Sequence, residues 1–236
     1  MKNYNTLSNR TMRRLLPIAC ITALAMAFTV SLSQPARADS VIITPPPVPF
    51  NIQVPAGNTA FLVGHGVGTQ NYVCAPSTSS PSGVAYVLFT PEATLFNDGG
   101  RQLITHYFSP NPTTDPPDPN TNPGVVSDEG AIRVTWQHRD TSTVWAKVNL
   151  NDDGSIGSSS DPDFVAKGAV NWLLLKKVGV QEGPTGGDTL TPTTFIQRLN
   201  TSEGLAPSSG CDSLANLGNQ AFMPYEADYF FYQKAE

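Results

Sequence analysis

The sequence predicts an all-β protein with a single domain, an antiparallel sandwich or barrel with long loops and one disulfide. Proline and glycine are frequent, with 21 and 19 of the 236 residues. The apolar segments between them are short and rich in the β-branched and aromatic residues that favour strands. No amphipathic stretch is long enough to predict a long helix, and only a short helical turn is expected, near Leu214–Asn216.

Nine segments are expected to form the strands of this domain. Each is short, rich in apolar residues and bounded by turn-forming residues. In chain order they are Ala60–Val67, Gln70–Cys74, Gly83–Thr90, Leu103–Phe108, Ala131–Gln137, Ser142–Val148, Val170–Val178, Thr193–Leu199 and Tyr225–Gln233. The last segment carries aromatic residues on both faces, which predicts a strand in the core or, alternatively, an exposed platform for stacking sugars.

Three further segments are expected to lack regular structure. Residues 39–50 form a proline-rich N-terminal arm before the domain proper at residues 51–236, because consecutive prolines fix φ and cannot donate to a sheet. Pro110–Gly124 is broken by prolines and poor in apolar residues, so a solvated loop of little order is expected. Asn149–Asp163 is a second loop; it resembles the start of a calcium loop, but Ser160 stands where a glutamate ligand is needed.

The N-terminal residues 1–38 are expected to be a signal peptide. Three arginines form a basic region, the run Leu15–Leu32 carries no charge, and Ala36-Arg37-Ala38 is a small-x-small cleavage signal. Export to the periplasm or the cell exterior is therefore expected, with no membrane span after cleavage. The apolar run is also long enough for a membrane anchor, which is the alternative.

Charge excludes two classes of partner once the leader is removed. Five of the 14 basic residues lie in residues 1–38, which leaves nine against 19 acidic residues and a net charge of about −10. Nucleic acids and anionic membranes are bound through basic surfaces, so neither is expected as a partner. The remaining 198 residues are enough to bury a substantial core as one domain.

Two cysteines remain after the leader, Cys74 and Cys211. An even number in an exported chain favours one disulfide, which would close a long loop and stabilise the fold by about 2–4 kcal/mol. Cysteines this far apart, without a CxxC motif, are poor zinc ligands.

The stretch Gly64–Cys74, GHGVGTQNYVC, comes closest to a ligand-binding motif. Its glycines are spaced GxGxG, with Thr69 where GxGxxG needs a glycine, and no helix follows, so it is not a dinucleotide fingerprint. At the period of a strand, Gly64, Gly66 and Gly68 share one face. That bare face is expected to accept another part of the protein or, alternatively, a ligand, and a kink is expected at Gly68 or Thr69.

The three histidines are the candidates for acid–base or metal chemistry. His65, His106 and His138 could converge with a carboxylate as the base of a hydrolase. No HxH or HExxH spacing is present, so satisfied structural histidines are the simpler expectation, and no metal or cofactor is expected. The chain has no GxSxG or SxxK motif, and no catalytic residue is identified.

Two charged residues, Arg198 and Asp228, complete the candidate ligand-binding residues. The strand TTFIQRLNT places Arg198 beside polar residues, where we expect it to pair with Asp228 or Asp140 as part of the structure. The alternative is that Arg198 binds a carboxylate ligand. The full candidate set is His65, Gly66, Gly68, His106, His138, Arg198 and Asp228.

Five blocks of the sequence, in the same order, resemble a known family. They are HGVGTQNYVC, HRDTSTVWAKV, the run from Asn171 to Thr201, GLAPSSGCD and YEADYFFY. The chain is similar in these blocks to the family catalogued as domain of unknown function 3455. The resemblance implies a secreted or envelope protein, and it implies no activity, cofactor or residue role. The family usually has proline where this chain has Asn171, and Pro110–Gly124 is an insertion relative to it.

Two functions are expected from these observations. The first is an exported, non-catalytic binding or structural module for a carbohydrate, a small molecule or a surface partner. The alternative is a secreted hydrolase whose histidines and carboxylates meet only in the fold. A shallow aromatic patch would support the first, whereas a deep polar cleft joining a histidine, a carboxylate and a nucleophile would support the second.

Overall fold

The computed structural model describes residues 42–113, 126–127 and 130–235. The predicted signal peptide lies outside these residues, as does the predicted loop from residue 114 onward. The described residues from Ile42 onward belong to one compact unit, and they include the proline-rich arm from that residue. Within them, no helix has the length and apolar character needed to cross a bilayer.

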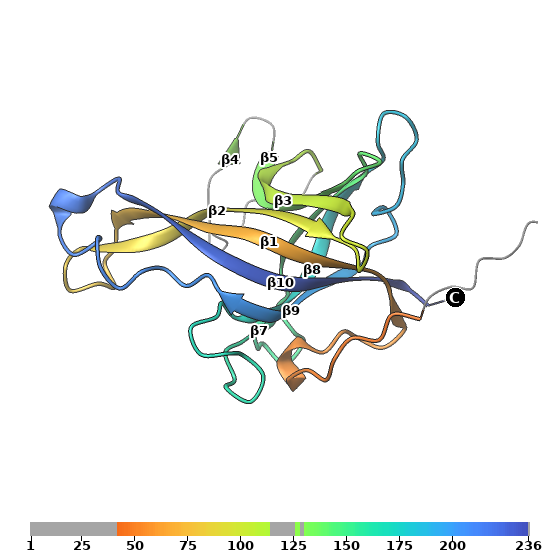
Figure 1. Ribbon diagram of the computed structural model, residues 1–236, viewed down its shortest axis with the longest axis horizontal. Coiled ribbons are helices and arrows are strands. Elements are labelled where there is room, and N and C mark those ends of the chain that lie inside the picture. The colour runs from red at the N-terminus through yellow and green to blue at the C-terminus, as the bar shows by residue number, and fades with distance from the viewer. Residues whose placement is uncertain (1–41, 114–125, 128–129, 236) are drawn as a thin grey trace, which may run out of the picture. The chain divides into compact units, whose positions relative to one another are not determined.

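Antiparallel strands make up the domain (Figure 1). No α-helix occurs in the described part of the chain, which has two short 3₁₀ helices, η1 (Phe50–Ile52) and η2 (Leu214–Asn216). The helical turn expected from the sequence is therefore confirmed. The strands are β1 (Asn58–Pro76), β2 (Val84–Phe96), β3 (Gln102–Asn111), β4 (Val126–Ser127), β5 (Gly130–His138), β6 (Thr143–Val148), β7 (Ser158–Ser159), β8 (Trp172–Gln181), β9 (Phe195–Glu203) and β10 (Gln220–Lys234).

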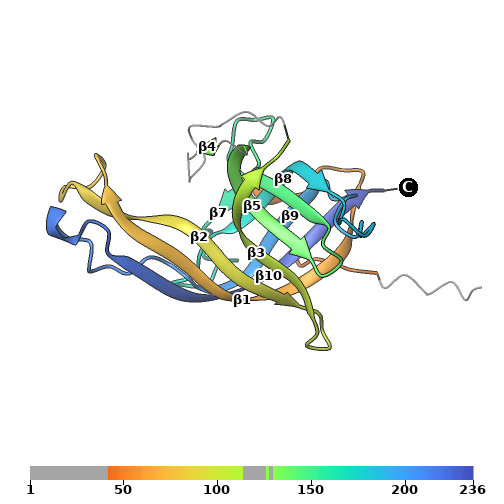
Figure 2. The same cartoon turned by 90° about the horizontal axis from the view of Figure 1, so that it is seen from above.

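Eight of these strands close into a barrel, which decides between the two architectures expected from the sequence. Their order is β3-β2-β1-β10-β9-β8-β6-β5, and β5 also pairs with β3 from Ile104↔His138 to Asn111↔Ala131 (Figure 2). The short strands β4 and β7 pair at the ends of β5 and β8. Around the closed barrel the strands pair on both sides, whereas β2 from Val84 to Glu92 and β10 from Gln220 to Pro224 pair only with β1.

Three details of the predicted strands are wrong. Two predicted segments form the single strand β1, whose pairing with β10 runs without interruption from Leu62 to Val73, so no kink lies at Gly68 or Thr69. A register shift lies instead between β1 and β2, where Asn71 pairs with Thr90 but Tyr72 pairs with Leu88. The loop predicted from Pro110 begins two residues later, because Pro110 and Asn111 still pair with β5. The loop from Asn149 contains the short strand β7.

The apolar residues form two cores, one on each side of the sheet. The larger core fills the barrel and includes the buried residues Leu95, Trp136, Leu175, Tyr229 and Phe231. The second lies outside β8, β9 and β10 and includes Ile52, Leu174, Leu199, Phe230 and Tyr232. Both faces of β10 are therefore buried from Tyr229 to Tyr232, so the aromatic residues of the predicted segment are core rather than a sugar platform. Each fully buried side chain of this size contributes about 1.5–3 kcal/mol.

The proline-rich arm covers this outer core. Residues Pro45–Val48 lie against Gln197 and Tyr232. Gln197 donates from Nε2 to Ile52 O at 2.6 Å and accepts a hydrogen bond from the Tyr232 hydroxyl. The polar residue in the otherwise apolar outward face of β9 is thus satisfied by the chain that precedes β1.

The predicted disulfide between Cys74 and Cys211 is confirmed. It joins the end of β1 to the loop between β9 and β10, with a Cα–Cα distance of 5.4 Å and a sequence separation of 137. Backbone hydrogen bonds from Cys74 N to Asn219 O and from Gly218 N to Cys74 O support the same junction. The closed loop is long, so the bond removes much of the freedom of the unfolded chain.

Candidate functional site

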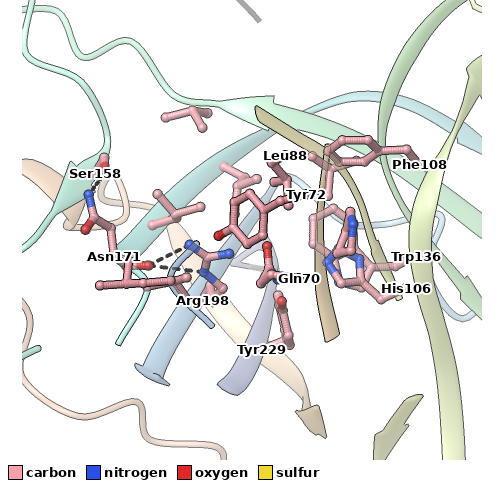
Figure 3. A pocket seen from close by; sticks show the side chains of 17 residues that line it. Gln70, Tyr72, Leu88, His106, Phe108, Trp136, Ser158, Asn171, Arg198 and Tyr229 are labelled. Carbon is pink, nitrogen blue, oxygen red and sulfur yellow. Dashed lines mark hydrogen bonds between the residues drawn. The ribbon is translucent and has the colours of Figure 1, made fainter. Parts of the chain in front are cut away.

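A cavity of about 380 Å³ lies inside the barrel (Figure 3). Side chains from β1, β2, β3, β5, β6, β8, β9 and β10 line it, because every second residue of each strand points inward. The apolar part of the wall consists of Leu88, Pro91, Phe108, Val134, Val148, Val170, Leu173, Leu175 and Leu205. Leu205 is 47% exposed and so marks the mouth.

The glycines of β1 also face inward, but the protein itself fills their bare face. A Cβ atom on Gly64 would lie 3.0 Å from the Leu95 side chain, and one on Gly66 would lie 3.0 Å from the Tyr229 ring. A Cβ atom on Gly68 would lie 2.0 Å from the Glu92 carbonyl oxygen. Of the two arrangements considered from the sequence, the structure has the packed one, and these glycines do not line the cavity.

One end of the cavity is an aromatic cluster around His106 (Figure 3). Its ring stacks on Trp136 with centroids 4.5 Å apart and lies 5.0 Å from the Tyr229 ring. Burial lowers the pKa of His106 to about 3, so the ring is neutral near neutral pH. Nδ1 donates to Thr135 O at 2.9 Å, which leaves Nε2 as an acceptor.

Arg198 lies at the other end of the cavity (Figure 3). It stands on β9 between Tyr229 of β10 and Leu173 of β8. Nε and Nη2 donate to the Asn171 carbonyl oxygen at 3.1 and 2.8 Å. The Asn171 side chain donates in turn to Ser158 Oγ at 3.0 Å, which fixes this end of the wall.

The expected ion pair of Arg198 with Asp228 or Asp140 is wrong. Arg198 points into the barrel, whereas Asp228 is next to the inward-facing Tyr229 and so points out. Asp228 contacts His65 and Asn200 instead. The carboxylate of Asp140 accepts hydrogen bonds elsewhere, at the turn after β5. No described aspartate or glutamate lines the cavity.

Two buried donors in the cavity wall have no hydrogen-bond partner. Gln70 is 2% exposed and its Nε2 is unpaired, and Trp136 is fully buried with Nε1 unpaired. Such a group costs about 1–3 kcal/mol when it is left unsatisfied. Neither nitrogen is exposed to the cavity, so the charged group that a ligand meets in this apolar wall is Arg198.

His65 is placed on the outer surface, away from the cavity. Nδ1 lies 2.6 Å from Asp228 Oδ1, and Nε2 lies 2.9 Å from Asp98 Oδ1. The hydrogen bond with Asp228 raises the pKa of His65 above that of a free histidine, although partial burial opposes it. With a carboxylate at each nitrogen, the protonated ring is favoured.

This outer ion pair predicts a pH-dependent contribution to stability. His65 binds its proton more tightly when folded, so its contribution is complete below the free value of about 6.5 and is lost as pH rises through the raised pKa. Replacing His65 by glutamine should therefore lower the free energy of unfolding more at about pH 5.5 than at about pH 8.5. The two losses should differ by about 1 kcal/mol or less, because the ring is partly exposed. Urea unfolding of wild type and variant at both pH values measures this difference. An equal loss of unfolding free energy at the two pH values would contradict the prediction.

His138 occupies a third, separate place at the end of β5. Its Nδ1 lies 2.9 Å from Asp140 Oδ1 and 3.3 Å from Asp140 N. The structure thus brings His106 and Arg198 together in the cavity and His65 and Asp228 together outside, with His138 in neither group. In the part of the chain that the structure describes, no three His, Cys, Asp or Glu side chains form a group that could hold a metal ion.

Sequence reasoning missed several residues of the cavity, namely Gln70, Tyr72, Trp136, Asn171 and Tyr229. Strand alternation is the signal that could have found Gln70, which follows Gly64, Gly66 and Gly68 on the same face of β1. It is a buried amide on a face otherwise occupied by glycine. No comparable signal marks Asn171, whose carbonyl oxygen holds Arg198 only because β8 lies beside β9.

Comparison with known proteins yields one family. The family described as protein of unknown function (DUF3455) matches residues 55–233, from just before β1 into the last residues of β10. No curated protein and no solved structure matches this chain. The matched stretch covers well over half of the chain and includes both cysteines of the disulfide and the cavity wall. The chain therefore belongs to the family described as protein of unknown function (DUF3455).

Proposed function

We propose that this protein is a non-catalytic binding module that holds one small, mainly apolar molecule inside its barrel. The observation that carries the proposal is the cavity, with about 380 Å³ of space and an apolar wall that includes Arg198. Eight-stranded barrels are filled by side chains or hold one small ligand. The volume lies within the range of known small-molecule sites.

The chemistry of the wall supports binding rather than hydrolysis. A hydrolase needs a nucleophile and a base within hydrogen-bond reach. His106 has no carboxylate beside it in the cavity wall, and Ser158, whose Oγ accepts from Asn171, lies at the opposite end (Figure 3). The apolar wall also fits an apolar molecule better than a carbohydrate, whose hydroxyl groups need many polar partners. We further propose that the module is exported, and its disulfide supports an oxidising compartment.

Filling the cavity tests this proposal. The probe is N-phenyl-1-naphthylamine, an uncharged dye whose emission rises in apolar surroundings. Leu88→Trp places a ring in the cavity and should weaken dye binding at least about tenfold, because the ring and the dye compete for one space. The dye is excited at a wavelength that tryptophan does not absorb, and its titration gives the dissociation constant.

The matched control is Leu150→Trp, which adds the same ring at a side chain that is 70% exposed. It should bind the dye as the wild type does. Circular dichroism and thermal melting establish that both variants are folded. A wild-type protein that does not bind the dye, or a folded Leu88→Trp variant that binds it unchanged, rejects the cavity as the ligand site.

A further inference from the structure

We propose that the ligand is a monocarboxylate with an apolar body, and that Arg198 binds its carboxylate inside the barrel. This inference rests on the proposed function and names the chemical class of the ligand. The observation behind it is an arginine in the cavity wall whose hydrogen bonds go to a neutral carbonyl oxygen.

Arg198 is oriented before any ligand arrives. The Asn171 carbonyl oxygen accepts from both Nε and Nη2 and so fixes the plane of the guanidinium group. A guanidinium has five N–H groups, and this carbonyl takes two of them. Such a planar, fixed group suits the two oxygens of a carboxylate, which it can bind through parallel hydrogen bonds.

The positive charge of Arg198 is not neutralised within the cavity. No described carboxylate lines the wall, and a cation with low exposure to water is costly unless it is paired. The hydroxyls near it are phenols: burial raises the pKa of Tyr72, Tyr225 and Tyr229, so all three stay uncharged near neutral pH. An anionic ligand would supply the missing charge.

The charge of the wall agrees with an anion of one charge, because Arg198 is the one charged side chain among the described residues that line the cavity. A single arginine matches one negative charge, whereas a phosphate monoester carries about two near neutral pH. The carboxylate is therefore the better match.

The size of the cavity limits the rest of the ligand. Its volume of about 380 Å³ equals that of about a dozen waters at about 30 Å³ each. Bonded atoms pack more closely than waters do, so a molecule of somewhat more than a dozen non-hydrogen atoms fits. The space beyond Arg198 is bounded by aliphatic side chains and the His106–Trp136 pair. A medium-length aliphatic or an aromatic acid fits this description.

Calorimetric titration of the folded, oxidised protein with octanoate and with octanol tests the inference directly. The two probes share an aliphatic chain and differ in charge. Octanoate should bind at least about tenfold more tightly than octanol, because a charge-assisted hydrogen bond contributes about 1.4 kcal/mol or more. Arg198→Gln should remove this preference, and Arg198→Lys, which keeps the charge but not the planar fork, should retain part of it.

Arg101→Gln is the control, because Arg101 is an exposed residue in the β2–β3 turn and should leave the preference unchanged. Equal binding of octanoate and octanol by the wild type overturns the inference and leaves the dye-binding proposal intact. A folded Arg198→Gln variant that keeps the preference also overturns it. If Arg198→Gln does not fold, Arg198→Lys and the wild-type comparison still decide. If the wild-type protein binds none of the three probes, the dye, octanoate or octanol, the cavity is rejected as a ligand site.

Discussion

Replacing Gly68 by alanine is expected to lower the free energy of unfolding by about 3 kcal/mol. The new Cβ atom would lie 2.0 Å from the Glu92 carbonyl oxygen and 2.5 Å from Ala93 Cα. Both are backbone atoms of β2, the strand paired with β1, so no side chain can rotate away. The strands must separate there, which disturbs ladder hydrogen bonds. Urea unfolding of the oxidised protein measures the effect.

Two other glycine variants make this prediction specific. Gly99→Ala places a Cβ atom 3.4 Å from its nearest contact, an ordinary distance, so its cost should be within about 0.5 kcal/mol. Gly66→Ala meets the Tyr229 ring at 3.0 Å and should fall between the two, since a ring can shift slightly. If Gly68→Ala is as stable as Gly99→Ala, the close approach of β1 and β2 is not real.

Replacing Asp140 by alanine is the second change with a large expected effect, about 3 kcal/mol of unfolding free energy. One carboxylate oxygen accepts from Ser142 N and Oγ at 2.9 and 2.6 Å, and the other accepts from Thr189 N and Oγ at 3.0 and 2.6 Å. The carboxylate therefore ties the β5–β6 turn to the loop between β8 and β9. Without the carboxylate, the backbone N–H and the hydroxyl of both Ser142 and Thr189 each lose one hydrogen-bond acceptor. Asp152→Ala, at an exposed position, is the control.

The same carboxylate gives the cost of Asp140→Ala a pH dependence. Burial would raise the pKa of Asp140, but the hydrogen bonds from Ser142 and Thr189 outweigh it and hold the pKa well below its usual range. The unfolded carboxyl therefore takes up a proton first as the pH falls, and the stabilisation is lost progressively below about pH 4. The difference between wild type and variant should be smaller at about pH 3 than at about pH 7. A difference that grows toward acid pH would contradict this account.

The character of the individual strands could be predicted because it depends on near neighbours in the chain. Alternation in LITHYF already places His106 and Phe108 on one face, and both line the cavity. The GxGxG spacing already puts Gly64, Gly66 and Gly68 on a single bare face. The two cysteines could be paired because they are the two that lie among the described residues.

The neighbours of the candidate residues could not be predicted in this way. Arg198 and Asp228 are close across β9 and β10, yet they point to opposite sides of the sheet, so the expected pair does not form. His65 meets Asp98 and Asp228 only because β1 lies between β2 and β10. Contacts across a sheet depend on register, and one residue of slip exchanges the two faces.

The sequence by itself determined the all-β class, the residues that share a face in a few strands and the one disulfide, since strand periodicity and cysteine number are local or countable properties. Only the tertiary structure decided that β3 pairs with β5 and closes a barrel rather than a sandwich. Closure is what encloses the cavity and places Arg198, Gln70 and Trp136 around one space. The physical reason is that closure requires the twist, stagger and register of eight strands to agree at once, and no single segment contains that information.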